Sequence, residues 1–483
     1  MRHALAFLVV VVAGVGFAGV RSVHAAREAD QAIPWARVSE GERVTLTRLL
    51  ESGDWPFRAF GLLRLERFSG PAVEAHLRKR LSDPAWQVRC FALRESGRMG
   101  IAIAPEDLDG EVDPRVIRTA LRHGVRLDGE RITQQATTLM RTKALEELML
   151  GLEIAAATDL QPIREEAVDR GLRLIKRMDD AVCALISRRL AVMLGVSQIP
   201  ETGRAWRQWL TERGGKLILP RPTRRPARRL LDNPSLVAEM DAETFARLLD
   251  YLEGLRQRDL DLVIVMDATA SMLPMVNEAR TGIDALILFL GDISGTMRLA
   301  FVAYRDHDNK PVWEGHPFTT DIEAIREFLF DLRITGGADY PEAVLEGVAA
   351  CRKLDWNRRA AREIVVVGDA PPHEEDYEKL TGTLETFRSN GVVVHAVHVP
   401  MRRRDGYERY LTPAQLAADI QWLKTYNHQT AEAFEEIARL GSGRMVTLTH
   451  RDQLVPSIMR FTIAEPWWPV FDEFYELYLE LCR

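Results

Sequence analysis

Two kinds of hydrophobic pattern divide the chain. From about residue 44 to residue 213, apolar residues recur at spacings of three and four, which is typical of amphipathic helices. From about residue 259 onward, short continuous apolar runs alternate with helical patterns. A continuous run predicts a strand that is buried on both faces of a parallel sheet. We therefore expect an all-helical region followed by an α/β domain with a doubly wound, mostly parallel sheet.

Apolar runs and the helical patterns between them predict the elements of the second domain. Strands are expected at residues 262–266, 298–304, 363–367, 392–399 and 445–448. Helices are expected at residues 241–258, 275–290, 321–332, 340–353, 378–389, 430–440, 452–461 and 471–481. The segment 401–428 is longer and more charged than an ordinary connection, so we expect an insertion with its own helix. We place the sheet domain at 259–460 and a helical extension at 461–483.

Within the helical region, a pattern recurs with a period of about 30 residues, which is in the range of stacked helical repeats. The sequence WPFRAF at residues 55–60 is echoed by WQVRCF at residues 86–91, and Asp83 and Asp113 each precede a proline. An Asp-Pro turn followed by an apolar-Arg-x-x-Ala helix resembles HEAT-type repeats, which bury a shared core between stacked hairpins. We assign residues 40–215 to this region, with an irregular helical domain as the alternative.

The first residues have the pattern of a secretory signal peptide. Arg2 and His3 precede an apolar run at residues 4–20, and Val23 and Ala25 are suitably placed for cleavage. We predict that residues 1–25 are removed and that the protein is secreted, periplasmic or at the cell surface. An uncleaved segment would instead anchor the protein in a membrane, and a buried helix is the remaining alternative.

The composition changes again between the two parts of the chain. Residues 216–234 combine prolines with Arg221, Arg224, Arg225, Arg228 and Arg229. Proline stiffness and like-charge repulsion predict an extended linker. Aromatic residues are not interleaved with the arginines for base stacking, so we expect no nucleic-acid partner.

The net charge of -6 favours no particular partner, and the four cysteines form no C-x-x-C pair, which argues against a thiolate metal site.

Oxygen-bearing side chains follow three predicted elements of the second domain. Asp267, Thr269 and Ser271 lie at alternate positions after the first strand, Asp339 follows a glycine-containing loop, and Asp369 follows the strand at 363–367. In open α/β sheets, ligands bind beyond the carboxyl ends of the strands. Carboxylates and hydroxyls favour Mg²⁺, Mn²⁺ or Ca²⁺ over Zn²⁺. The sequence therefore predicts a divalent-cation site at this edge of the sheet.

The order and spacing of these residues resemble the von Willebrand factor type A domain. In that family, a D-x-S-x-S motif, a hydroxyl ligand from a second loop and an Asp from a third loop form a metal-ion-dependent adhesion site. The resemblance implies that Asp267, Thr269, Ser271 and Asp369 hold Mg²⁺, with Mn²⁺ or Ca²⁺ as alternatives. It also implies that a partner supplies a carboxylate to the bound ion.

The second loop departs from the family's usual Gly-Gly-Thr. The chain has Gly337, Ala338 and Asp339 there, preceded by Thr335. Either Asp339 or Thr335 is a candidate ligand. A capping box formed by Asp339 and Glu342 explains the same residues as the start of a helix.

Further residues after the strands could line the rim of the site. Asp306 and His307 follow the strand at 298–304, and His373 follows Asp369 by four positions. The sequences YRDH at 304–307 and DAPPH at 369–373 are similar to the subgroup of these domains that is attached to alpha-kinases. No kinase domain is visible in this chain, so kinase activity is not implied.

Taken together, these features predict a binding protein rather than an enzyme. The chain has no G-x-S-x-G elbow, phosphate-binding loop or dinucleotide fingerprint. We expect a protein or another acidic ligand at the metal, and the helical region could bind a second protein. The alternatives are a structural scaffold with a vestigial metal site and a metal-dependent hydrolase in which His373 acts as the general base.

Overall fold

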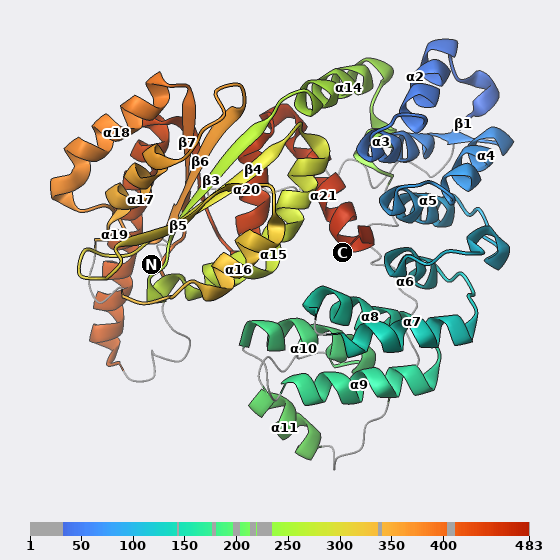
Figure 1. Ribbon diagram of the computed structural model, residues 1–483, viewed down its shortest axis with the longest axis horizontal. Helices are drawn as coiled ribbons and strands as arrows, with labels where there is room; N and C mark the ends of the chain where they lie inside the picture. The colour runs from blue at the N-terminus through green and yellow to red at the C-terminus, as the bar shows by residue number, and fades with distance from the viewer. Residues whose placement is uncertain are drawn as a thin grey trace, which may run out of the picture.

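The computed structural model describes residues 32–142, 144–175, 180–196, 203–212, 219, 234–336, 341–402 and 411–482 (Figure 1). The predicted signal peptide, nearly all of the predicted linker and Asp339 lie outside these residues. Among the helices that are described, none combines the length and the apolar composition needed to cross a membrane.

The C-terminal domain is built on a six-stranded sheet with the order β5-β4-β3-β6-β7-β8. The strands are β3 (Leu260–Asp267), β4 (Met297–Tyr304), β5 (Trp313–Thr319), β6 (Ala361–Gly368), β7 (Val392–His398) and β8 (Ser442–Thr447). All neighbouring pairs are parallel except β4 and β5. Every residue of the central strand β3 is buried, as its continuous apolar run predicts. The predicted doubly wound, mostly parallel sheet is thus confirmed.

The edge strand β5 was not predicted from the sequence. It reads WEGHPFT and alternates between exposed and partly buried positions. A glycine and a proline interrupt it, and proline is tolerated at the edge of a sheet because one side of the strand is free of ladder hydrogen bonds. At Gly315 a Cβ would come within 2.7 Å of the Phe301 carbonyl oxygen, so the two backbones approach closely there.

Helices cover both faces of the sheet. Alternate residues of β3 contribute to two different cores: Leu262 and Ile264 join one, and Val263 and Val265 join the other. The first core includes residues of α15 (Leu273–Ile293), α16 (Ile322–Asp331) and α20 (Leu454–Thr462). The second core includes residues of α17 (Val344–Ala350), α18 (Tyr377–Ser389) and α19 (Pro413–Leu440).

Two helices differ from their predicted extents. The helix expected at 340–353 is α17, which covers only Val344–Ala350 and continues into a short 3-10 turn at Cys351–Lys353. The insertion expected at 401–428 does contain a helix, but this helix is not separate from the one expected at 430–440. Both form the single helix α19 because the sequence from Pro413 to Leu440 contains no internal glycine or proline. Thr412 and Gln415 form a capping box at its start, and Gly441 follows its end.

The N-terminal region is helical, as predicted. A short pair of strands, β1 (Ile33–Pro34) and β2 (Phe68–Ser69), lies at its beginning. Its helices are α2 (Glu40–Leu50), α3 (Trp55–Leu65), α4 (Pro71–Arg80), α5 (Trp86–Arg98), α6 (Pro114–Arg122), α7 (Gly129–Arg141), α8 (Leu145–Ala157), α9 (Gln161–Ile175), α10 (Asp180–Leu194) and α11 (Gly203–Glu212). Helices α13 (Leu236–Glu239) and α14 (Ala242–Arg256) lead from it to β3.

Arginines at corresponding positions of the sequence repeat make corresponding contacts. Arg58 of α3 lies 2.8 Å from Asp83, Arg89 of α5 lies 2.6 Å from Glu111, and Arg118 of α6 lies 2.6 Å from Glu153. Each acid comes from a later part of the helical stack, so the ion pairs join successive layers. This regularity is consistent with a helical repeat region, while the assignment to HEAT-type repeats stays a prediction.

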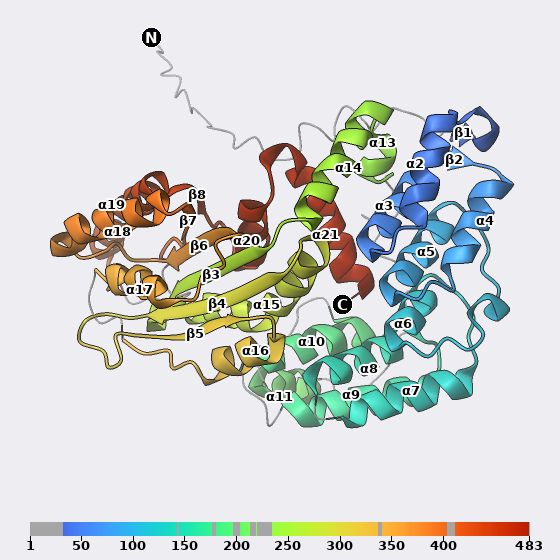
Figure 2. The same cartoon turned by 45° about the horizontal axis from the view of Figure 1, so that its top comes forward.

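The C-terminal helix α21 (Trp468–Cys482) joins the two regions (Figure 2). The ring of Phe474 lies 4.3 Å from that of Phe60 in the helical region and 5.8 Å from that of Phe289 on α15. The carbonyl oxygen of Leu481 accepts a hydrogen bond of 2.7 Å from Arg118. The helical extension therefore packs against both parts of the chain.

Candidate metal centre

Asp267 is the last residue of β3 and lies at the centre of the predicted site. Its side chain is fully buried, and its Oδ1 atom accepts a hydrogen bond of 2.7 Å from the backbone N–H of Thr269. Its Oδ2 atom is buried and accepts no hydrogen bond from any described residue. A buried carboxylate oxygen without a donor is costly in a folded protein, so it is an expected position for an external cation.

The other predicted ligands of the first and third loops lie together beside Asp267. The Thr269 and Ser271 hydroxyls are 3.2 Å apart, and the Ser271 hydroxyl donates a hydrogen bond of 3.2 Å to Oδ1 of Asp369. Asp369 is close because β6 pairs directly with β3, which places the loops after these two strands side by side. Ser271 is exposed, so the site is open to solvent on one side.

Close packing holds the third loop against the first. Gly368 immediately precedes Asp369, and a Cβ at this position would come within 2.5 Å of the Tyr304 hydroxyl and 3.0 Å of the Phe434 ring. Only glycine therefore fits there without displacing an aromatic side chain. The position of Asp369 is thus set by the sheet and by the core beneath it.

The two carboxyl groups lack a counter-charge. Burial and the neighbouring Asp369 raise the pKa of Asp267 to about 8, and burial raises the pKa of Asp369 to about 6. Within the described ranges, no lysine or arginine forms an ion pair with either group. A divalent cation would stabilise both ionised carboxylates. The donor set, two carboxylates and two hydroxyls, fits a hard cation such as Mg²⁺.

The second loop runs alongside the first. The backbone N–H of Thr335 donates a hydrogen bond of 3.2 Å to Ala268, and the N–H of Ala270 donates one of 3.3 Å to Gly336. Gly336 has a φ of +91°, and a Cβ there would come within 2.6 Å of the Asn309 side chain. The backbone at Thr335 is thus beside the site. Asp339 lies outside the described residues, so the choice between Thr335 and Asp339 as a ligand stays a prediction.

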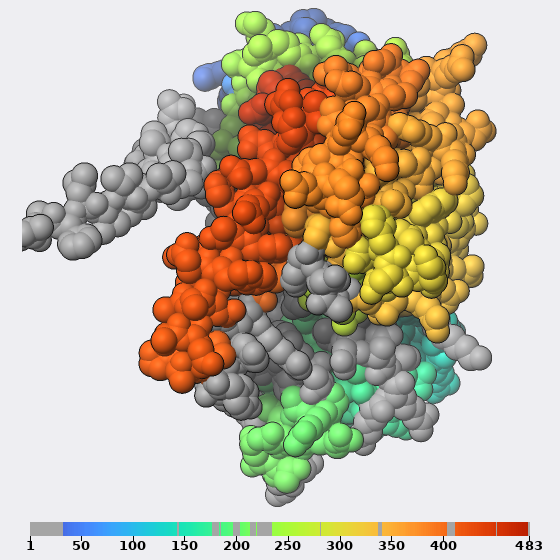
Figure 3. Space-filling view, turned by 90° about the vertical axis from the view of Figure 1, so that its left-hand side faces the viewer, coloured from blue at the N-terminus to red at the C-terminus, as the bar shows by residue number. Residues whose placement is uncertain are grey.

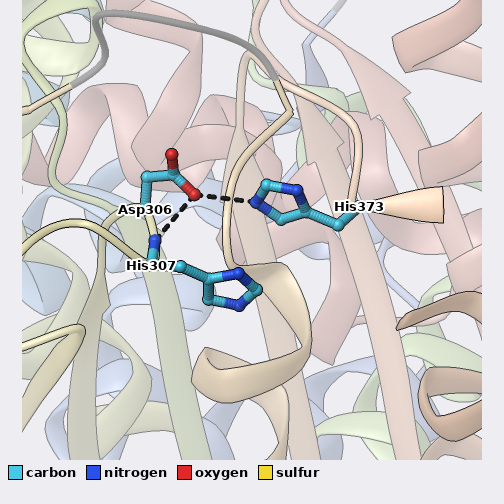
Figure 4. Close-up of side chains that lie close together, drawn as sticks. All are labelled: Asp306, His307 and His373. Atoms are coloured by element: carbon cyan, nitrogen blue, oxygen red, sulfur yellow. Dashed lines mark hydrogen bonds and ion pairs between the residues drawn. The ribbon is translucent and has the colours of Figure 1, made fainter. Parts of the chain in front are cut away.

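The three predicted rim residues form a cluster of their own (Figure 4). Nε2 of His373 lies 2.7 Å from Oδ1 of Asp306, and the rings of His307 and His373 stack with their centroids 4.5 Å apart. Glu346 and Asp376, which were not predicted from the sequence, also face this cluster through His307. Among described residues, none of the rim residues hydrogen bonds to Asp267, Thr269, Ser271 or Asp369.

A groove of about 730 Å³ lies next to the loop that carries Asp369. Its lining includes three prolines, three aromatic residues and three glutamates: Pro341, Pro371, Pro372, Tyr377, Trp422, Tyr426, Glu374, Glu432 and Glu436. Trp422 is 49% exposed and stacks on Tyr426 at a centroid distance of 5.2 Å. Both belong to α19, which projects from the sheet domain (Figure 3).

Two named proteins are similar in sequence to part of the chain. The alpha-protein kinase vwkA of Dictyostelium discoideum is 26% identical over 138 residues, which are 28% of this chain and 22% of that protein. The putative ariadne-like RING finger protein R811 of Acanthamoeba polyphaga mimivirus is 26% identical over 119 residues, or 25% of this chain and 12% of that protein. The aligned part is therefore a small share of each relative.

Among solved structures, the chain is matched to the pilus adhesin SpaC from Lactobacillus rhamnosus GG in its open conformation. It has a TM-score of 0.31 and 11% identity, and the match covers 43% of this chain and 30% of the adhesin. The sequence pattern of the von Willebrand factor A domain matches residues 261–450. These are the residues that carry the sheet, Asp267, Thr269, Ser271 and Asp369. Residues 261–450 of the chain therefore belong to the von Willebrand factor A domain family.

Proposed function

We propose that the chain is an interaction protein that binds an acidic group of a partner through a divalent cation. Asp267, Thr269, Ser271 and Asp369 would hold the cation, which we propose to be Mg²⁺, with Mn²⁺ or Ca²⁺ as alternatives. The observation that supports this most directly is the buried Oδ2 atom of Asp267, which has no hydrogen-bond donor in the described part of the chain.

The charges of the four residues favour an anionic partner. Thr269 and Ser271 are neutral oxygen donors, so only Asp267 and Asp369 oppose the charge of a bound cation. A divalent cation with few anionic ligands attracts a further carboxylate. The exposed position of Ser271 leaves that side of the site accessible to such a group.

The neighbouring groove would contact residues that flank the partner's acidic group. Pro371 and Pro372 connect it to the loop of Asp369, and Trp422 offers a large exposed apolar surface. Exposed tryptophans are frequent anchors in protein interfaces. Glu432 and Glu436 along the groove would favour a basic or neutral segment beside the acidic group.

We further propose a binding role without catalysis. A hydrolase at this site would need a positioned general base, and His373 is the candidate. Its Nε2 atom lies 2.7 Å from Oδ1 of Asp306, and among the described residues His373 makes no hydrogen bond to the four proposed metal ligands. This arrangement supports binding as the function of the site.

The location outside the cytoplasm is also a proposal, and it rests on the signal-peptide pattern of residues 1–25. The stacked helices of the N-terminal region would offer a separate surface for a second protein. Repeat regions of this kind present extended surfaces that are suited to such contacts.

Affinity capture with the full chain lacking residues 1–25 tests the proposed function. The wild type, Asp267→Ala and the control Asp169→Ala would be immobilised and exposed to the extracytoplasmic fraction of the source cells. Asp169 is an exposed residue of the helical region. We expect a partner that is retained in Mg²⁺ by the wild type and the control, released by EDTA, and not captured by Asp267→Ala. Retention by a folded Asp267→Ala protein in EDTA would contradict the proposal.

A further inference from the structure

A second group of potential metal ligands lies around His307. It comprises two imidazoles and three carboxylates: Asp306, His307, Glu346, His373 and Asp376. They come from the loop after β4, from α17 and from the segment between β6 and α18. The cluster shares no residue with the oxygen-only site at Asp267.

Three atoms of the cluster have the spacing of metal ligands. Nε2 of His307 lies 3.1 Å from Oε1 of Glu346 and 3.7 Å from Oδ2 of Asp376. The ligand atoms of these three residues lie within 4.8 Å of one another. Bonds of 2.0–2.1 Å in a tetrahedral zinc site place ligand atoms about 3.4 Å apart, so small side-chain adjustments suffice.

Asp376 provides an independent indication of a ligand. The residue is only 5% exposed, and its Oδ2 atom accepts no hydrogen bond from the described residues. This atom faces Nε2 of His307. One oxygen of Glu346 is likewise buried without a hydrogen bond in that part of the chain. Buried carboxylate oxygens in this position require a cation or a proton.

The cluster has more acidic than basic groups, so a divalent cation would balance its charge. Its three carboxylates face two imidazoles, and no described lysine or arginine forms an ion pair with Asp306, Glu346 or Asp376. An imidazole ligand together with carboxylates favours a transition metal such as Zn²⁺ over Mg²⁺. The side chains of His307 and Glu346 are 40% and 32% exposed, which gives an ion access from solvent.

We propose that His307, Glu346 and Asp376 bind a divalent transition metal of the Zn²⁺ class. His373 acts as a positioning residue: its ring stacks on that of His307 with an interplanar angle of 12°, and Asp306 contacts its Nε2 atom at the edge of the ring (Figure 4). Three protein ligands and an open side leave a further coordination position for water or an incoming ligand. This site does not depend on the proposed function of the Mg²⁺ site.

Zinc titration of the full chain in excess Mg²⁺ tests this proposal. We expect the wild type to bind one Zn²⁺ by calorimetry, and Co²⁺ in its place to give the visible absorption of a nitrogen- and oxygen-ligated ion. Asp376→Asn and Glu346→Gln, which keep the side-chain shape, are expected to weaken Zn²⁺ binding by at least about tenfold. His373→Phe should preserve the stack and change the Co²⁺ spectrum with a smaller loss of affinity.

Two controls make the result decisive. Asp267→Ala should bind Zn²⁺ as the wild type does, because the two sites share no ligand. His428→Gln removes a surface histidine that pairs with Glu432 and should also have no effect. The proposal is overturned if the wild type binds no Zn²⁺. It is also overturned if folded Asp376→Asn and Glu346→Gln proteins bind Zn²⁺ as tightly as the wild type, or if Asp267→Ala alone removes the binding.

Discussion

Two buried acids, one in each region of the molecule, have opposite electrostatic surroundings, and their pKa values are shifted in opposite directions. Glu153 in the helical region is surrounded by Arg118, Arg189 and Arg122 at 2.6, 2.9 and 3.5 Å. Burial raises its pKa, but the three guanidinium groups outweigh burial and hold the pKa below its usual value. At Asp267 in the sheet domain, burial and the like charge of Asp369 act together and raise the pKa to about 8.

The difference separates a structural charge from the proposed metal site. Glu153 has its counter-charges within the chain, so it joins helices and needs nothing from outside. Asp267 lies at the carboxyl end of a parallel strand, and its ionised form has no counter-charge among the described residues. Burial alone therefore does not distinguish the two carboxylates, whereas the presence or absence of a cationic partner among the described residues does.

The largest expected effect is the loss of stability in Glu153→Gln. This change removes the negative charge that balances Arg118, which is fully buried. Breaking a buried ion pair from one side costs about 3 kcal/mol or more of unfolding free energy, measured by urea denaturation. Asp169→Asn at the exposed pair with Arg173 is the control and should cost less than about 1 kcal/mol. A loss at Glu153 as small as the control's would remove the contrast between the two regions.

The change Asp267→Asn should raise the free energy of unfolding, whereas Glu153→Gln should lower it. Because burial and Asp369 raise the pKa of Asp267 to about 8, the folded chain without a metal holds a proton on this group at neutral pH that the unfolded chain does not hold. Asparagine removes the cost of binding that proton, so in EDTA at neutral pH we expect a gain of about 2 kcal/mol in unfolding free energy. The same variant should no longer be stabilised by added Mg²⁺ in a thermal melt. If Asp267→Asn is destabilised in EDTA, Asp267 is a structural residue and the comparison with Glu153 fails.

A buried histidine should make the folding stability depend on pH, with an effect smaller than those expected at Glu153 and Asp267. Burial lowers the pKa of His395 to about 3, and its ring stacks on Phe461 at 4.5 Å. Between the folded pKa and the unfolded value of about 6.5, the unfolded chain binds a proton that the folded chain does not. This group should therefore cost about 1 kcal/mol of stability between pH 6 and pH 5, and nothing above about pH 7.

The variant His395→Gln should remove this part of the pH slope. His428→Gln at an exposed position is the matched control. Urea denaturation at several pH values measures the difference between the two variants. If the unfolding free energies of the two variants fall equally steeply below about pH 6, His395 does not contribute to the pH dependence of stability.

The smallest expected effect on stability is at Trp422. Because this residue is 49% exposed and stacks on Tyr426 within the same helix, Trp422→Ala should change the unfolding free energy by less than about 0.5 kcal/mol. The same variant should weaken capture of the proposed acidic partner. A large loss of stability would show that the groove residues serve the fold instead.

Much of the sheet domain could be predicted from hydrophobic pattern because its strands are buried on both faces. The continuous apolar runs at 262–266 and 363–367 predict central strands, and both lie in strands of the structure, β3 and β6. The edge strand β5 lacks such a run because it is only partly buried. The joining of the insertion helix with its neighbour into α19 was missed because local pattern does not show where one amphipathic helix ends and another begins.

The candidate site was predictable only where its residues follow strands. Asp267 and Asp369 end neighbouring strands, so topology alone brings them together. Glu346 lies inside a helix and Asp376 at the end of a short turn, where acids are common at the surface. Their approach to His307 depends on how α17 and α18 pack on the sheet, which the sequence pattern does not determine.

Magnesium titration by calorimetry, with the full chain and with Asp267→Ala, tests the central claim most directly. The uncompensated carboxylates predict one Mg²⁺ bound per wild-type chain and an affinity at least about tenfold weaker in the folded variant. Equal Mg²⁺ binding by the two proteins, or no binding by either, would contradict the assignment of Asp267, Thr269, Ser271 and Asp369 as a metal centre.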